Sequence, residues 1–318
     1  MANDRSHQDP SIVIERAGLR ERAELASANV PFRVKVALVW IVVIALLAVF
    51  FTLANFDVPW MREKFFFIAK GLKYTVIIAV GGIVLAFVLA CLGALARISK
   101  NPVAYGVAGF YTSFFRGTPL IVQLFLIYLA LPQVALNLHT RFPDVFSRDF
   151  ARFFILDAAV VGILALGLNY GAYMTEIFRA GIQSISGGQS EAADALGMSY
   201  GQKMRRVILP QALRVVIPPT GNEFIAMMKD TALISVLGAN IQTAELFRRA
   251  QFVGQADVKA LEAFIVAALV YWALTILLSY FQGKLEARLS RGYDRTAVAT
   301  KKGKAAPASD PALGGGQH

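Results

Sequence analysis

Residues 74–96 read YTVIIAVGGIVLAFVLACLGALA, which is 23 consecutive residues without a charged side chain between Lys73 and Arg97. An α-helix rises about 1.5 Å per residue, so about 20 apolar residues cross the hydrocarbon core of a bilayer, which is about 30 Å thick. A strand of a membrane barrel needs only about 10 residues and alternates apolar with polar side chains. The stretch therefore predicts a membrane-spanning α-helix.

Four further uncharged stretches of 18 to 22 residues predict four more spanning helices, at residues 36–56, 117–138, 158–175 and 263–283. Within the second of these, Pro119 and Pro132 mark expected bends or boundaries, because proline lacks an N–H donor and breaks a helix interior. A long charged segment precedes the stretch at 36–56. We therefore expect a retained N-terminal anchor there rather than a cleaved signal peptide.

A sixth stretch, Arg214–Leu246, is mostly apolar but contains Glu223, Lys229 and Asp230. Charges at bilayer depth are costly and persist where they face protein or a water-filled path. We therefore expect this stretch to span the membrane with its polar face buried in the protein. Since lipid permits only helices or closed barrels, the predicted fold class is all-α, a polytopic transmembrane helical bundle of about six spans.

The composition agrees with a membrane protein, because 56% of the 318 residues are apolar and only 17% are charged. These values exclude a disordered chain, which would be polar and poor in aromatic residues. The net charge of +11 would also suit nucleic acid. However, 20 of the 32 Lys and Arg residues fall on the side that holds both chain ends, and 10 on the other. The positive-inside rule therefore predicts cytoplasmic termini, with a tail at 1–35 and a flexible basic tail at 291–318.

Cysteine and histidine are nearly absent from the chain. Cys91 is the only cysteine, and His7, His139 and His318 are scattered along the sequence. One thiol cannot form a disulfide framework, and the histidines show no metal-ligand spacing. The sequence therefore predicts no metal site and no cofactor.

The longest loop on the predicted cytoplasmic side covers residues 184–210 and contains a short helical pattern. Ser190 can cap a helix N-terminus, where the helix dipole also favours Glu191. Residues 192–195 include three alanines, which favour a helix with a smooth face, and Gly197 suits a left-handed stop. Such a helix can lie close against a groove of another protein.

A second helical piece, residues 202–208, carries Lys203, Arg205 and Arg206, and Pro210 then opens the next span. A helix, a turn and a basic helix are also typical of a DNA-reading helix-turn-helix. This loop is tied at both ends to membrane spans and has no third helix to form a core. We therefore do not favour nucleic-acid binding.

At these residues the sequence resembles the permeases of ATP-binding-cassette (ABC) importers. Their loop has the form Glu-Ala-Ala, three residues, Gly, nine residues, Ile, one residue, Leu-Pro. The matches are Glu191-Ala192-Ala193, Gly197 and Leu209-Pro210, with Val207 at the isoleucine position. Three more stretches are similar to the branch that handles histidine, glutamate, glutamine, arginine and opines: FRGTPL at 115–120, AYMTEIFR at 172–179 and GNEF at 221–224.

The resemblance covers about residues 66–290 and implies a type I ABC importer permease domain with five spans, so the helix at 36–56 is an N-terminal addition. It implies that the Glu-Ala-Ala helix docks on a separate cytoplasmic ATPase, which makes 184–210 the coupling loop. It also implies an external amino-acid-binding protein and a second permease subunit, identical or related, in a bacterial inner membrane. The chain has no Gly-x-x-x-x-Gly-Lys-Ser/Thr motif, so we expect ATP hydrolysis in the partner and not in this chain.

Seven polar residues are candidates for the substrate path: Arg116, Gln123, Glu176, Asn222, Glu223, Lys229 and Asp230. An arginine binds a carboxylate with bidentate geometry, acids bind an ammonium group, and the two amides can form neutral hydrogen bonds. The alternative is that these residues pair with one another or cap helix ends, as adjacent Lys229 and Asp230 can. Both interpretations stay open at this point.

The sequence thus predicts the membrane subunit of an ABC importer for polar amino acids. One alternative is a secondary transporter driven by an ion gradient, which would need coupling-ion carboxylates and unwound helices in both halves. Another is a membrane scaffold without transport, in which the charges within the spans would have no purpose.

Overall fold

The computed structural model describes residues 31–185 and 187–289. Every regular element within these ranges is a helix, which confirms the all-α fold class. The predicted tails at 1–35 and 291–318 fall almost entirely outside the described residues. The chain divides after Val58 into two units, and each is described by itself.

The first unit contains one described helix, α3 (Phe32–Leu53), which confirms the predicted helix at 36–56 apart from its last residues. None of its residues is buried, and apolar side chains cover its whole circumference. A helix that is apolar on all sides suits a hydrocarbon surrounding. It is one of the stretches long and apolar enough to cross a membrane.

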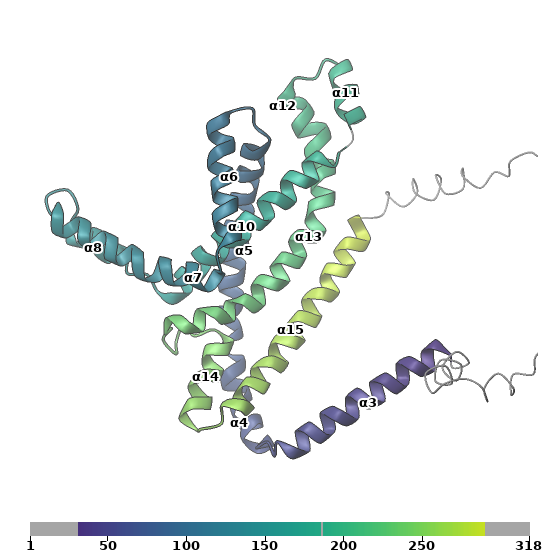
Figure 1. The fold of residues 1–318 in the computed structure, drawn as a ribbon, viewed down its shortest axis with the longest axis vertical. Coiled ribbons are helices and arrows are strands. Elements are labelled where there is room, and N and C mark those ends of the chain that lie inside the picture. The colour runs from purple at the N-terminus through teal and green to yellow at the C-terminus, as the bar shows by residue number, and fades with distance from the viewer. Residues whose placement is uncertain (1–30, 186, 290–318) are drawn as a thin grey trace, which may run out of the picture. The chain divides into compact units, whose positions relative to one another are not determined.

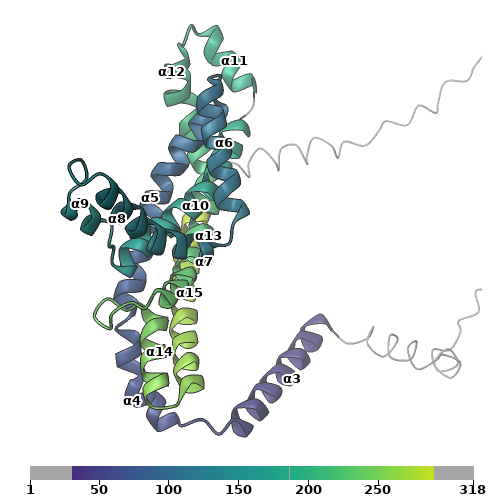
Figure 2. The same cartoon turned by 60° about the vertical axis from the view of Figure 1, so that its left-hand side comes forward.

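The second unit is a helical bundle whose elements follow one another closely (Figure 1). In chain order they are α4 (Val58–Ala69), α5 (Leu72–Ile98), α6 (Pro102–Gly117), α7 (Leu120–Phe125), the π-helical turn η1 (Leu126–Ala130), α8 (Leu131–Arg141), α9 (Arg148–Phe153), α10 (Ala158–Gln183), α11 (Gly187–Ala195), α12 (Tyr200–Lys203), the π-helical turn η2 (Met204–Ile208), α13 (Leu209–Asp230), the 3-10 helix η3 (Thr231–Leu237), α14 (Leu246–Ala256) and α15 (Ala260–Leu289). Figures 1 and 2 both show α11 and α12 at one end of this unit and α4 and α14 at the opposite end.

Five helical stretches of the described chain are long and apolar enough to cross a membrane: Phe32–Leu53, Val58–Ile98, Leu120–Arg141, Ala158–Gln183 and Ala260–Leu289. They contain all or most of the five uncharged stretches, so those predictions are confirmed as helices. The second is longer than predicted, because α4 precedes α5 and joins it through a turn at Lys70 and Gly71.

The sixth predicted span is wrong in its extent. The chain from Arg214 to Leu246 is not one helix, because α13 ends at Asp230 and the short 3-10 helix η3 follows. Gly238 then adopts φ +74°, a left-handed conformation that ends η3. Helix α13 is also not among the described helices that are long and apolar enough to cross a membrane.

Helix α6 was not predicted, because the uncharged stretch between Lys100 and Arg116 has only 15 residues, too few for a span. It begins with Asn101, whose side chain accepts hydrogen bonds from the backbone N–H groups of Val103 and Ala104. Both predicted proline boundaries are confirmed: Pro119 is the N-cap of α7, and Pro132 lies in the first turn of α8 after the π-helical turn. The chain between α6 and α7 is therefore a break within the bundle.

Helix α10 lies at the centre of the unit. In the most apolar 18-residue stretch of α10, 67% of the residues are buried, against at most 33% in the corresponding stretches of the other candidate spans. It packs most extensively on α5, and glycines allow the close approach. A Cβ atom at Gly167 would lie 2.5 Å from Leu85 Cδ2, and one at Gly171 would lie 2.6 Å from Tyr111 Oη. These glycines therefore serve close helix packing.

At the opposite end from α11, a buried carboxylate fixes the start of α14. Glu245 is 1% exposed, and its carboxylate accepts the backbone N–H groups of Phe247 and Arg248, both at 2.6 Å. The Tyr271 hydroxyl of α15 donates to it at 3.0 Å. Glu245 was not among the predicted site residues, although it lies inside the stretch that was expected to span.

We predict that Gly71→Ala destabilises the protein. A Cβ atom there would lie 2.6 Å from Leu246 Cα, and this backbone cannot move without displacing the start of α14. Such overpacking costs about 1–3 kcal/mol. Gly106→Ala is the matched control, since nothing lies within 4 Å of its Cβ position. Thermal unfolding of both variants in detergent tests this, and equal midpoints would contradict it.

Candidate functional site

The first candidate region is the loop 184–210, whose helical pattern the structure confirms. Helix α11 spans Gly187–Ala195, and Gly197 adopts φ +71°, as expected of a left-handed stop. The predicted N-cap at Ser190 is wrong, because α11 already begins at Gly187 and places Ser190 in its first turn. Glu191 is exposed, as are the apolar side chains of Leu196 and Tyr200.

The second half of the loop is held together by its own contacts. Ser199 and Gln202 form a capping box at the start of α12, and Lys203 Nζ pairs with both carboxylate oxygens of Asp194 at 2.8 Å. Leu209 and Pro210 begin α13, so the predicted helix opening is confirmed. The result is a small helical hairpin between α10 and α13 that leaves its apolar tip exposed.

The second candidate region is a polar cavity of about 520 Å³ inside the second unit. Residues of α6, α7, α10, α13 and the break between α6 and α7 line it: Arg116, Gly117, Thr118, Pro119, Leu120, Asn169, Tyr170, Tyr173, Glu223 and Asp230. The break explains why a cavity exists here, because non-helical backbone within a membrane protein lies where it borders protein or a water-filled space.

Three of the five charged candidates meet at this cavity, namely Arg116, Glu223 and Asp230. The Tyr170 hydroxyl donates to Asp230 Oδ2 at 2.9 Å, and the Arg116 guanidinium lies 5.3 Å from the centre of the Tyr173 ring. One cationic and two anionic side chains thus share a small space. This arrangement can bind a molecule that carries both a carboxylate and positively charged groups.

The other four candidates lie elsewhere. Lys229 is exposed and does not line the cavity. The Asn222 side-chain oxygen accepts a hydrogen bond from Gln282 of α15 at 2.8 Å. Glu176 pairs with Arg179 and Arg97, in agreement with the alternative that these charges pair with one another.

Gln123 lies behind the cavity wall and is 2% exposed. Its Nε2 lies 2.9 Å from the Phe115 carbonyl and 3.1 Å from that of Thr118, while its Oε1 accepts from Asn169 Nδ2 at 3.1 Å. Asn169 Nδ2 also donates to the Phe115 carbonyl, at 3.0 Å. Gln123 therefore supports the helix break and is not open to a substrate.

Sequence reasoning missed the α10 residues of the cavity, Asn169, Tyr170 and Tyr173. A usable signal was present, because polar or hydroxyl-bearing side chains recur one helical turn apart in a span that is otherwise apolar. Without the position of α13, however, the sequence does not reveal that Tyr170 faces Asp230.

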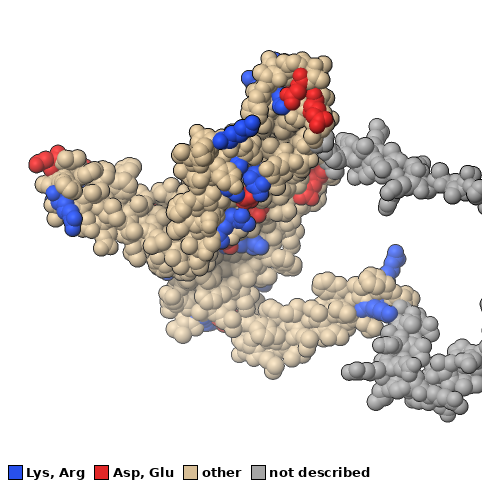
Figure 3. Space-filling view, turned by 45° about the horizontal axis from the view of Figure 1, so that its top comes forward, with Lys and Arg blue, Asp and Glu red and all other residues tan. Residues whose placement is uncertain are grey.

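Charged side chains gather at the end of the unit that carries the loop 184–210. Figure 3 turns this end forward and shows Lys and Arg side chains in a band with acidic side chains among them. Most of the surrounding surface in this view is uncharged. Such a distribution is typical of the region where a membrane domain meets water.

Comparison with known proteins identifies the family. Residues 82–291 match the binding-protein-dependent transport system inner membrane components. This chain belongs to that family. The resemblance found in the loop 184–210 is thereby confirmed, and so is the function class, the permease subunit of an importer. Because transport in this family depends on a binding protein, the alternative of an ion-gradient-driven secondary transporter finds no support.

Individual relatives agree with this membership. The probable amino-acid ABC transporter permease protein PatM of Vibrio harveyi is 40% identical over 241 residues, which cover 76% of this chain and all of the relative. The L-cystine transport system permease protein TcyB of Bacillus subtilis is 39% identical over 238 residues, 74% of this chain and 92% of the relative.

A solved structure shows the same fold. The crystal structure of an amino acid ABC transporter with histidines contains a chain that is 33% identical, with a TM-score of 0.63, and the match covers 74% of this chain and 99% of that one. The fold is therefore that of an ABC importer permease, with membrane-spanning helices as the sequence predicts.

We predict that Gln123→Leu destabilises the protein, because it removes the donors that reach the carbonyls of Phe115 and Thr118 and one of the two acceptors of Asn169 Nδ2. An unsatisfied buried polar group costs about 1–3 kcal/mol. Gln133→Leu, at an exposed position of α8, is the control. The midpoint of thermal unfolding is measured, and a Gln123→Leu midpoint as high as that of the control would refute the support role.

Proposed function

We propose that this chain carries polar amino acids across the bacterial inner membrane, and that the substrate binds in the cavity between α6, α7, α10 and α13. The observation that carries the proposal is the meeting of Arg116 with Glu223 and Asp230 at one space of about 520 Å³. Arg116 would bind the α-carboxylate, and the two acids would bind the α-ammonium and any positive side chain. The names of the relatives, which handle amino acids, support this substrate class.

The charge balance of the cavity further narrows the substrate. Two carboxylates face one guanidinium, so an amino acid with a net positive charge neutralises the site, whereas an acidic one adds to the excess of negative charge. Charges in a low-dielectric surrounding are costly when they are not balanced. We therefore rank cationic amino acids above zwitterionic ones, and acidic ones last.

The loop 184–210 is the proposed docking site for the ATPase. Exposed Leu196 and Tyr200 offer an apolar contact at its tip, next to exposed Glu191. ATP hydrolysis would occur in that partner and not in this chain. We further propose that a binding protein delivers substrate outside, that a second permease subunit, identical or related, completes the complex, and that both termini lie in the cytoplasm.

Reconstitution tests the proposal directly. The chain is placed in proteoliposomes with candidate ATPase and binding-protein partners, and uptake of labelled arginine, glutamine and glutamate is measured with and without ATP. We expect ATP-dependent uptake that is fastest for arginine. Uptake driven by an ion gradient without ATP would overturn the proposed function.

Within this assay, we predict that Arg116→Gln and the pair Glu223→Gln and Asp230→Asn act differently. Arg116 is exposed at the cavity and would donate charge-assisted hydrogen bonds to the substrate carboxylate. Losing such bonds costs about 2 kcal/mol, so we expect Arg116→Gln to lower uptake of every amino acid by about thirtyfold. The acid substitutions should lower arginine uptake much more than glutamine uptake. Equal losses for both substrates would contradict the assigned charge roles. Lys229→Gln, at an exposed position outside the cavity, is the control.

We also predict that Glu191→Lys leaves the protein inserted but uncouples it from the ATPase, because it reverses an exposed charge beside the apolar tip of the loop. Like-charge contacts cost several kcal/mol at interfaces, so uptake should fall about tenfold or more. Co-purification of the ATPase is measured in parallel. Asp149→Lys, an equal change on exposed α9, is the control, and unchanged co-purification of Glu191→Lys would count against the docking role.

A further inference from the structure

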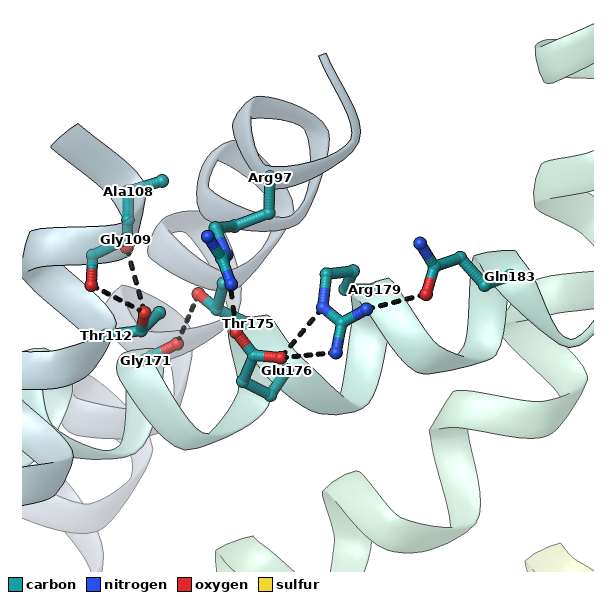
Figure 4. A network of polar contacts seen from close by, with 9 residues as sticks. All are labelled: Arg97, Ala108, Gly109, Thr112, Gly171, Thr175, Glu176, Arg179 and Gln183. Atoms are coloured by element: carbon teal, nitrogen blue, oxygen red, sulfur yellow. Dashed lines mark hydrogen bonds and ion pairs between the residues drawn. The ribbon is translucent and has the colours of Figure 1, made fainter. Parts of the chain in front are cut away.

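The end of α10 nearest the loop 184–210 carries a row of polar side chains on one face. Figure 4 shows Glu176, Arg179 and Gln183 along this face, with Arg97 of α5 reaching toward Glu176. Arg179 places Nε at 2.8 Å and Nη2 at 2.7 Å from Glu176 Oε2, and its Nη1 donates to Gln183 Oε1 at 2.6 Å. Arg179 and Gln183 therefore fix the Glu176 side chain from within α10.

Arg97 connects this row to two other helices. Its Nε lies 3.5 Å from Glu176 Oε1, and its guanidinium lies over the Tyr105 ring of α6, 4.5 Å from the ring centre. The side chains of Arg97 and Glu176 are only 21% and 19% exposed. Glu176 thus joins α10 to α5, and through Arg97 to α6, at a place where water screens the charges only partly.

The two arginines hold Glu176 in different ways. Arg179 takes Oε2 with two short contacts, whereas Arg97 Nε is buried without a well-aligned hydrogen bond and reaches Oε1 only at ion-pair distance. The contact between Arg97 and Glu176 is therefore mainly electrostatic. Such a contact can be broken and remade while the carboxylate stays paired with Arg179.

Along α10, the row of polar side chains lies between the cavity wall and the loop 184–210. Tyr173, which lines the cavity, lies one helical turn before Glu176, and Gln183 lies one turn before α11 begins at Gly187. On another side of α10, Gly181 lies so close to α13 that a Cβ atom there would overlap Val216 Cγ1. The last turns of α10 therefore lie between α5 and α13, and they connect the cavity wall with the loop.

We infer that Glu176 is a positioning residue that ties the loop end of α10 to α5 and α6 through Arg97, so that movement of the loop 184–210 reaches the cavity wall. This inference rests on the proposed function, in which that loop receives the ATPase. Glu176 does not contact substrate in this role. It transmits the position of α11 to the helices that line the path.

A transport measurement tests the role. In the reconstituted complex, the number of ATP molecules hydrolysed per amino acid imported is determined for the wild type and for Glu176→Gln, Arg97→Gln and Arg97→Lys. Coupling between sites is commonly fivefold or more, so we expect this ratio to rise about fivefold in both glutamine variants. Arg97→Lys keeps the charge and should stay near the wild-type ratio. Asp149→Asn, in the exposed pair with Arg152, is the matched control.

The double variant Arg97→Gln with Glu176→Gln should be no worse than Glu176→Gln alone, because Glu176→Gln already removes the ion pair with Arg97. Thermal unfolding is measured for each variant, so a change in the ratio can be separated from a loss of stability. A ratio for Glu176→Gln within twofold of the wild type would overturn the inference.

A second measurement does not depend on transport. In a Cys91→Ser background, Lys100→Cys and Gly188→Cys place spin labels at two exposed positions, one after α5 and one in α11. Labelled chains are diluted with unlabelled ones in nanodiscs, so that only distances within one chain are recorded. We expect a narrow distance distribution, which Glu176→Gln broadens. Identical distributions would overturn the inference even if transport succeeds, and failed transport of the wild type would overturn only the proposed function.

Discussion

The constraint on which the rest of the structure depends is that every backbone polar group inside a membrane must find a partner within the protein. Continuous helices satisfy it, but a bundle of continuous helices leaves little room for a polar substrate. The break between α6 and α7 makes room, and it frees the carbonyls of Phe115 and Thr118. Gln123 supplies missing donors from behind the cavity wall, and Asn169 supplies one from within the wall. Two amides that could serve a substrate are thus used by the backbone, which leaves recognition to the charged side chains.

Helix α10 unites the parts of the molecule that the proposed function requires. Its glycine-rich half packs so closely on α5 that the two helices form one body around Gly167 and Gly171. Beyond this region, Tyr173 reaches the cavity and Glu176 reaches Arg97. One helix therefore contributes to the bundle core, the cavity wall and the attachment of the loop 184–210. A displacement of the loop would therefore reach the ion pair of Arg97 with Glu176 before it reaches the close packing of α10 on α5 at Gly167 and Gly171.

The spans were predictable because each charged residue in lipid carries its own energetic cost, so that an uncharged stretch of about 20 residues indicates a span. Residues 74–96 lie wholly within α5 for this reason, and Gly197 stops its helix as expected because few residues tolerate φ +71°. Helix α6 was missed because only 15 uncharged residues separate Lys100 from Arg116. Arg97, at the end of α5, is shielded by Glu176 and Tyr105 in the folded protein. Sequence alone does not show that shielding, since the partners come from different helices.

The sequence indicated that charged residues within the spans would line a polar site, but not which of the candidates would lie there. Charges in apolar stretches indicated Arg116, Glu223 and Asp230, which the fold brings to one cavity, because such charges persist only where they face protein or water. The same rule marked Glu176, which is received by two arginines and not by the cavity. The same rule applies to Glu245, which was overlooked. It is a buried carboxylate that backbone N–H groups and Tyr271 satisfy. What separates a binding charge from a structural one is the number of partners that the fold brings to it, and that number is set by packing between helices far apart in sequence.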